Sequence, residues 1–159
     1  MVTTNSLQKL MDTLSNLTVL VNQKGNTLSM ETITLIVNAI NLLKPIAKYL
    51  QVELKSAEFM GQRFQIKCWG VFIGAVYVES SSTSIPLIMD TQGIYLLGFD
   101  TTEKYIFALI ERQSEERLIA IVDIVHNRLV EAKEKMATRL QNLTTREQKL
   151  NAVKDFLKS

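Results

Sequence analysis

The chain has 159 residues, and its 18 Lys and Arg nearly balance its 16 Asp and Glu, for a net charge of +2. A hydrophobic content of 47% excludes a wholly disordered protein, and the length favours one domain with room for an inserted subdomain. The longest apolar run, Val71–Val78, is far shorter than the roughly 20 residues that span a bilayer. The first residues lack the basic and apolar regions of a signal peptide, so we predict a cytoplasmic protein without membrane contact.

The reactive residues are few: one His (His126), one Cys (Cys68) and one Trp (Trp69). One Cys forms no internal disulfide, and one His with one Cys makes no His/Cys zinc site within a chain. Any His-dependent nucleophilic mechanism would have to use His126. The motifs GxGxxG, GxxxxGK[ST], HExxH, CxxC and GxSxG do not occur. We therefore predict a non-enzymatic protein with no catalytic residues, no cofactor and no metal, although scattered carboxylates or lysines leave a minor alternative.

Two helices are predicted at the N-terminus. The first runs from about Asn5 to Lys24 and ends at Gly25, and its apolar stripe comprises Leu7, Leu10, Met11, Leu14, Leu17 and Val21. The second begins after Ser29, an N-cap, and continues to Leu54 with a kink or division at Pro45. It carries a main stripe from Ile33 and a second stripe, namely Leu35, Ala39, Leu42, Ile46 and Tyr49. A helix that is apolar on two sides is expected to be buried on two sides.

The period changes from Arg63 onward, where Phe64, Ile66 and Cys68 alternate with polar residues as in a half-buried strand. Gly70 and Gly74 indicate a bulge or a close backbone approach. Residues 85–89 and 94–99 flank Asp90-Thr91-Gln92-Gly93, which predicts a hairpin. Residues 61–99 therefore predict a small antiparallel sheet of three or four strands.

The segment 100–112 is ambiguous. Residues 100–103 fit a helical capping box, but Tyr105, Phe107 and Leu109 alternate as in a strand, and we favour a fourth strand. A long helix follows over 115–143, although its first residues are also compatible with a strand. Thr144 or Thr145 then caps a last helix.

The fold class is thus α+β, with an αα–β–αα plan. Residues 1–60 and 113–159 form a mainly helical bundle, and residues 61–112 form an inserted small antiparallel β-sheet.

Positive charge concentrates toward the C-terminus, where residues 112–159 carry ten basic and seven acidic groups. Arg117, Arg128, Lys135 and Arg139 fall within about 40° of one another on the long helix, and Lys149 and Lys154 extend the basic character. A solvated helix face is the favoured interpretation, because Arg and Lys stems often cover the edge of a core. The alternatives are an anionic protein partner and a surface that contacts nucleic-acid phosphates.

A second candidate nucleic-acid face comprises Arg63, Lys67 and Trp69. Trp69 is predicted to point to the opposite face of the strand from Cys68, the face that also carries the basic residues. An exposed Trp69 on that face would be placed to stack on a base or on a partner. Packing beneath a helix is the favoured alternative. Cys68 and the methionines Met30, Met60 and Met136 are predicted to fill the core, and His126 is predicted to be a partly buried structural residue.

The plan resembles that of the small subunit of archaeal type I-A CRISPR effector complexes, which have a helical bundle with an inserted small β-region. The resemblance is carried by residues 20–44 (LVNQKGNTLSMETITLIVNAINLLK), by the β-block 63–99 and by the terminal helices, and it is one of architecture only. It implies a non-catalytic subunit of an antiviral ribonucleoprotein that contacts nucleic-acid backbone and neighbouring subunits. It carries no site residue over to this chain.

We therefore expect a subunit of a larger assembly with protein partners, its own copies or others, and favour a nucleoprotein complex with RNA or DNA. A self-associating scaffold or regulator without nucleic acid is the alternative. A small-molecule sensor, with a pocket formed by the sheet and Trp69, is the third.

Overall fold

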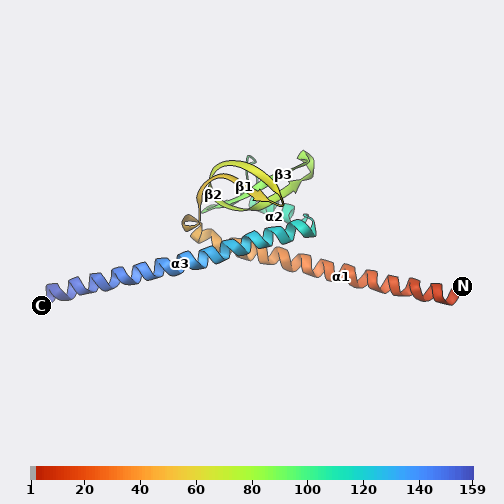
Figure 1. Ribbon diagram of the computed structural model, residues 1–159, viewed down its shortest axis with the longest axis horizontal. Coiled ribbons are helices and arrows are strands. Elements are labelled where there is room, and N and C mark those ends of the chain that lie inside the picture. Colours follow the sequence, from red (N-terminus) through yellow and green to blue (C-terminus); the bar gives the residue numbers. More distant parts are fainter. Residues whose placement is uncertain (1–2) are drawn as a thin grey trace.

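The computed structural model describes residues 3–159 and shows a small sheet lying across two long helices (Figure 1). The elements in chain order are α1 (Thr4–Leu43), the 3-10 helix η1 (Lys44–Tyr49), β1 (Val52–Phe59), β2 (Gln62–Val78), the 3-10 turn η2 (Glu79–Ser81), β3 (Thr83–Asp90), β4 (Gly93–Leu96), α2 (Glu103–Glu111) and α3 (Glu115–Lys158). The predicted α+β class with a small antiparallel sheet is confirmed.

α1 is one continuous helix, so the predicted break between Gly25 and Ser29 was wrong. Gly25 is not among the residues with positive φ, and the chain therefore does not turn away there. A glycine in a helix interior costs about 1 kcal/mol relative to alanine, which lowers stability locally but does not end the helix. Thr27 donates its hydroxyl hydrogen bond to the carbonyl of Gln23, so this side chain also stays within the helical pattern.

The helix ends at Leu43, next to Pro45, as a proline in the pattern predicts. The expectation that a helix continues to Leu54 was wrong, because β1 begins at Val52. β1 turns into β2 through Met60 and Gly61, whose φ angles of 51° and 77° are those of a tight primed hairpin turn.

The four strands form an antiparallel meander in the order β1-β2-β3-β4. The long strand β2 pairs with β1 through its first half and with β3 through its second half. The register shifts between Phe72 and Gly74, and an added Cβ at Gly74 would lie 3.3 Å from the Phe59 ring. At Gly70 an added Cβ would lie 2.6 Å from the Ile88 side chain. The predicted bulge and close approach are both confirmed.

Residues 103–111 form the helix α2, so the fourth strand expected in this segment was wrong. Thr102 caps the helix, since its hydroxyl oxygen accepts a hydrogen bond from the amide of Tyr105. The buried residues Ile106, Leu109 and Ile110 are spaced as one helix face, and this spacing overrides the alternation from Tyr105 to Leu109.

α3 is likewise continuous to Lys158, and no separate last helix begins at Thr144 or Thr145. The hydroxyl groups of these two threonines donate hydrogen bonds to the carbonyls of Leu140 and Gln141, one turn earlier in the same helix. They act as interior helix residues rather than caps.

The core lies where α1 and α3 cross beneath the sheet (Figure 1). α1 contributes Ile36, Ala39, Ile40 and Leu43, and α3 contributes Leu118, Ile121, Val125 and Ala132. Within the single chain α1 is not buried on two sides as expected, because Leu35 and Leu42 of the second stripe are exposed. The body of the protein covers only one face of α1.

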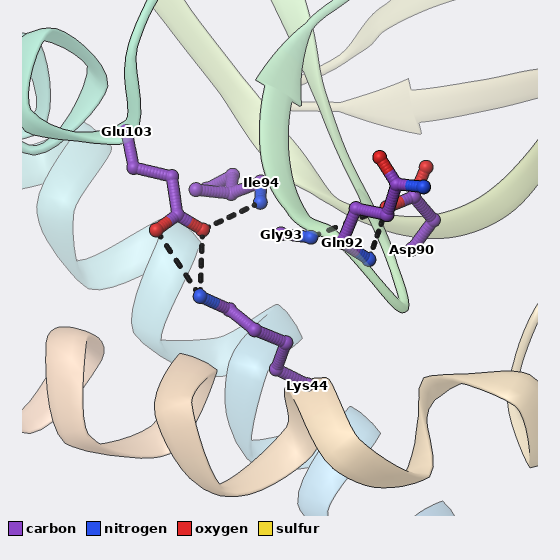
Figure 2. A network of polar contacts seen from close by, with 6 residues as sticks. All are labelled: Lys44, Asp90, Gln92, Gly93, Ile94 and Glu103. Carbon is purple, nitrogen blue, oxygen red and sulfur yellow. Dashed lines mark hydrogen bonds and ion pairs between the residues drawn. The ribbon is translucent and has the colours of Figure 1, made fainter.

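A network of polar contacts fixes the end of α1 to the β3–β4 hairpin and to the start of α2 (Figure 2). Lys44 Nζ lies 3.0 Å from Glu103 Oε1, and the same carboxylate oxygen accepts a hydrogen bond of 3.1 Å from the amide of Ile94. Asp90 Oδ1 accepts bonds from the amides of Gln92 and Gly93 and so closes the hairpin turn.

The charge of Glu103 makes the stability of this network depend on pH. Burial alone would raise the pKa of Glu103, but the hydrogen bonds from Lys44 and Ile94 and the charge of Lys44 outweigh it and lower the pKa. Because the pKa of Glu103 is lower in the folded protein than its ordinary value of 4.5, the ionised side chain stabilises the fold above pH 4.5. This stabilisation is lost as the pH falls through the folded-state pKa. We expect Glu103→Gln to lower the unfolding free energy at pH 7 and to have progressively less effect below pH 4.5. Urea unfolding of both proteins across this range measures the difference, and a difference that does not change with pH would contradict the assignment.

Gly93 allows Glu103 to approach the hairpin. Its φ is +144°, and an added Cβ would overlap Glu103 Oε1 at 2.1 Å. We expect Gly93→Ala to lower the unfolding free energy by about 1–3 kcal/mol through backbone strain and displacement of Glu103. Gly61→Ala, also at positive φ but with nothing within 4 Å of its added Cβ, separates backbone strain from that displacement. Equal losses in the two variants would show that displacement of Glu103 contributes nothing.

Candidate assembly surface and basic flank

Each long helix extends beyond the body as an exposed arm, and the arms point in opposite directions (Figure 1). We define the N-terminal arm as residues 4–24 of α1 and the C-terminal arm as residues 137–158 of α3, in which every residue is exposed. At 1.5 Å per residue, the arms are about 30 Å long.

The N-terminal arm begins a row of apolar side chains that continues along α1 across the body. The row repeats every seven residues and comprises Leu7, Leu14, Val21, Leu28, Leu35 and Leu42, which we call the heptad ladder. Its side chains are between 46% and 67% exposed. Leu10 and Leu17 widen the ladder on the arm, and both are also exposed.

The C-terminal arm also presents apolar side chains to solvent. Its exposed large apolar residues are Leu140, Leu143, Leu150, Val153, Phe156 and Leu157. The same arm has five basic and two acidic side chains, for a net charge of +3. It is therefore both apolar and basic.

The basic flank predicted on the C-terminal helix comprises Arg117, Arg128, Lys135, Arg139, Lys149 and Lys154. Two of these six residues belong to the body. Arg117 Nη2 donates a 2.8 Å hydrogen bond to Ser84 Oγ, and its guanidinium lies over the rings of Phe59 and Tyr77. Its Nη1 is buried without a hydrogen-bond partner among residues 3–159. Arg128 forms an ion pair of 2.6 Å with Glu131. Both side chains therefore have structural partners within the chain.

The other four lie farther along α3. Lys135 Nζ donates a 3.0 Å hydrogen bond to the carbonyl of Tyr49, at the edge of the body. Arg139, Lys149 and Lys154 lie on the exposed C-terminal arm. From Arg117 to Lys154 the helix rises about 56 Å, so the six residues are spread along α3 rather than gathered in one compact site.

The secondary candidate face is exposed, and the favoured expectation that Trp69 packs beneath a helix was wrong. Trp69 is 57% exposed, and Arg63 and Lys67 are exposed on the same side of β2. Glu53 of β1 lies directly opposite Trp69 in the strand register. Trp69, Lys55 and Lys67 line an open hollow of about 630 Å³, and Glu53 lines it as well. The acidic Glu53 makes this face less suited to phosphate than its basic residues alone suggest.

Three expectations about single residues also change. His126 is exposed rather than partly buried, and Met30 and Met60 are exposed rather than in the core. Cys68 is partly buried and packs against the core, as expected.

The heptad ladder was not among the features predicted from the sequence. Its signal was the exact repetition of apolar residues at seven-residue intervals across Gly25 and Ser29. Dividing the helix at those residues concealed the repeat.

Within residues 3–159, no group of three or more His, Cys, Asp or Glu side chains is placed to hold a metal ion. The segment Thr4–Tyr49 is long and apolar enough to cross a membrane by length and composition alone, a test that core helices and signal sequences also pass. The expected cytoplasmic location therefore stays a prediction.

Comparison with protein families, curated proteins and solved structures finds no match to this chain.

Proposed function

We propose that the protein is a non-catalytic subunit of a larger assembly, and that its two helical arms are the elements through which it assembles. The observation that carries this proposal is the exposure of apolar side chains along both arms. The proposal includes no cofactor and no metal.

Most helices in proteins are stabilised by packing of an apolar face rather than by intrinsic helix propensity. Each arm has such a face, but the body does not cover it. Contiguous apolar surface of this kind is typical of protein interaction sites. A partner that covers the arms would supply the missing packing.

The proposal predicts that a charge on the apolar face of an arm disrupts assembly. We expect Leu14→Asp and Leu150→Asp each to reduce the assembled fraction by at least tenfold, measured by light scattering over a range of concentrations. Both residues lie outside the core, so the body should stay folded.

Matched controls place the same charge elsewhere on each arm. Asn16→Asp and Gln148→Asp change exposed residues about 160° around the helix from Leu14 and Leu150, respectively, and should leave assembly unchanged. If the wild-type protein is a strict monomer at high concentration and recovers no partner from its native cells, the proposal is wrong.

A second candidate function is contact with nucleic-acid backbone, and the net charge of +3 on the C-terminal arm favours it. An exposed basic helix attracts phosphates with little dependence on sequence. In this form the protein would be a subunit of a nucleoprotein complex, and the resemblance to the CRISPR small subunit stays a prediction.

A further inference from the structure

We infer that the heptad ladder of α1 pairs with the ladder of a second copy of the chain, with the two helices antiparallel. This inference rests on the proposed function and specifies the partner of one arm. The product would be a symmetric dimer joined by a two-stranded coiled coil about 53 Å long.

The spacing of the ladder favours a helix as the partner. Positions seven residues apart drift by about 20° per repeat on a straight α-helix, and a strict repeat of seven keeps facing a partner only when two helices supercoil. The ladder keeps this repeat from Leu7 to Leu42 without interruption. A flat apolar surface such as a bilayer would instead favour a period of 3.6 residues.

The surface beside the ladder has the form that receives a partner's side chain. Glu31, Thr34, Leu35 and Asn38 line a shallow hollow on α1. These positions are i, i+3, i+4 and i+7, the four residues that form a hole for an inserted knob in a coiled coil.

Charge complementarity specifies the antiparallel direction. Lys24 lies three residues after the ladder residue Val21, and Glu31 lies three residues after Leu28. One of these two side chains is basic and the other is acidic. A parallel pair in register would place Lys24 opposite Lys24 and Glu31 opposite Glu31. An antiparallel pair centred near Asn26 brings Lys24 of each copy close to Glu31 of the other, and it sets Leu10 against Leu42.

The body leaves most of the ladder accessible in this arrangement, and only Leu28 shares a hollow with Glu115, Leu118 and Ile119 of α3. Ile36, Ile40 and Leu43 of α1 face the core, whereas Leu35 and Leu42 are exposed on another side of the same helix. The antiparallel pairing places the two bodies at opposite ends of the coiled coil. The N-terminal arm of each copy then lies alongside the part of the partner's α1 that is nearest to the partner's own body.

Disulfide crosslinking of the full chain tests the pairing. In a Cys68→Ser background, one chain carries Leu10→Cys and a second, distinguishable by mass, carries Leu42→Cys. We expect oxidation of the mixture to yield mainly the disulfide between the two different chains. Leu10→Cys alone should crosslink at least tenfold less, because its two copies lie at opposite ends of the dimer.

A charge exchange provides an independent measurement. Lys24→Glu and Glu31→Lys should each weaken self-association several-fold, because each creates like charges across the antiparallel pair. The double variant should restore it. In a parallel pair neither substitution would create new like-charge contacts, and the double variant would have no restoring effect.

The alternative outcomes separate this inference from the proposed function. Efficient self-crosslinking of Leu10→Cys would overturn the antiparallel direction. An assembly that persists in light scattering without a crosslink between the two chains would overturn pairing through the ladder and leave assembly standing. A monomer that binds anionic phospholipid vesicles would overturn pairing in favour of a membrane surface, and a strict monomer without any partner would contradict both.

Discussion

Ile40→Ala should lower the free energy of unfolding by about 2–5 kcal/mol, the range for removing a large aliphatic side chain from a core. Ile40 is 1% exposed and lies on the face of α1 that packs beneath the sheet. The substitution leaves a cavity at the point where α1, α3 and the sheet meet. Because small domains have only about 5–15 kcal/mol of stability, this loss is a large share of the total.

Leu42→Ala is the matched control, because it removes an aliphatic side chain from the same helix two residues later. Leu42 is 67% exposed, so the unfolding free energy measured by urea at low protein concentration should change by less than about 0.5 kcal/mol. The same variant should weaken self-association, since Leu42 belongs to the heptad ladder. Equal losses of stability in the two variants would contradict the assignment of the two faces.

The local patterns that the sequence predicted correctly are those whose signal lies within a few residues. The Asp90–Gly93 turn formed as expected, because the Asp90 carboxylate accepts hydrogen bonds from the amides of Gln92 and Gly93, and Gly93 supplies positive φ. The bulge at Gly74 was likewise visible as a glycine within an apolar strand.

The helix boundaries were predicted less well, because stop signals compete with the cooperative continuation of a helix. Gly25 and Thr144 occupy positions inside regular helix, where their penalties are small compared with the gain from uninterrupted hydrogen bonding. At residues 105–109 the alternating pattern was misleading, because Ile106, Leu109 and Ile110 define the buried face.

Burial on two sides of α1 could not be decided from one chain. A second apolar stripe indicates that something covers it, but the pattern is the same for the protein's own body and for another chain. The structure shows that the body covers only the side of Ile36 and Ile40.

The basic flank also separates what a helix pattern predicts from what only the tertiary fold determines. Helix periodicity placed Arg117, Arg128, Lys135 and Arg139 within a narrow angle, and the continuous helix α3 carries all four. The contacts of Arg117 with Ser84 and of Lys135 with the Tyr49 carbonyl depend on the tertiary fold, which the helix pattern does not contain. The residues best placed for an external anion are therefore those farther along, on the arm.

Lys149→Ala with Lys154→Ala should weaken binding to nucleic acid if the C-terminal arm contacts phosphates. Each phosphate contact contributes about 0.7–0.9 to the slope of log K against log salt. Contacts from Arg139, Lys149 and Lys154 would give a slope of about −2 to −3, and the double substitution should reduce its magnitude by between one and two units. Binding to single-stranded DNA, double-stranded DNA and RNA at several salt concentrations measures the slope.

A control with the same loss of charge distinguishes contact from general attraction. Lys9→Ala with Lys104→Ala also removes two positive charges, but from the N-terminal arm and from α2, where both side chains are exposed. This pair should lower affinity slightly and leave the salt slope within about half a unit of the wild-type value. An equal reduction in both double variants would show that the C-terminal arm makes no specific contact. If the protein and its natural assembly bind no nucleic acid at low salt, nucleic-acid contact is excluded, and the function of the arms is assembly alone.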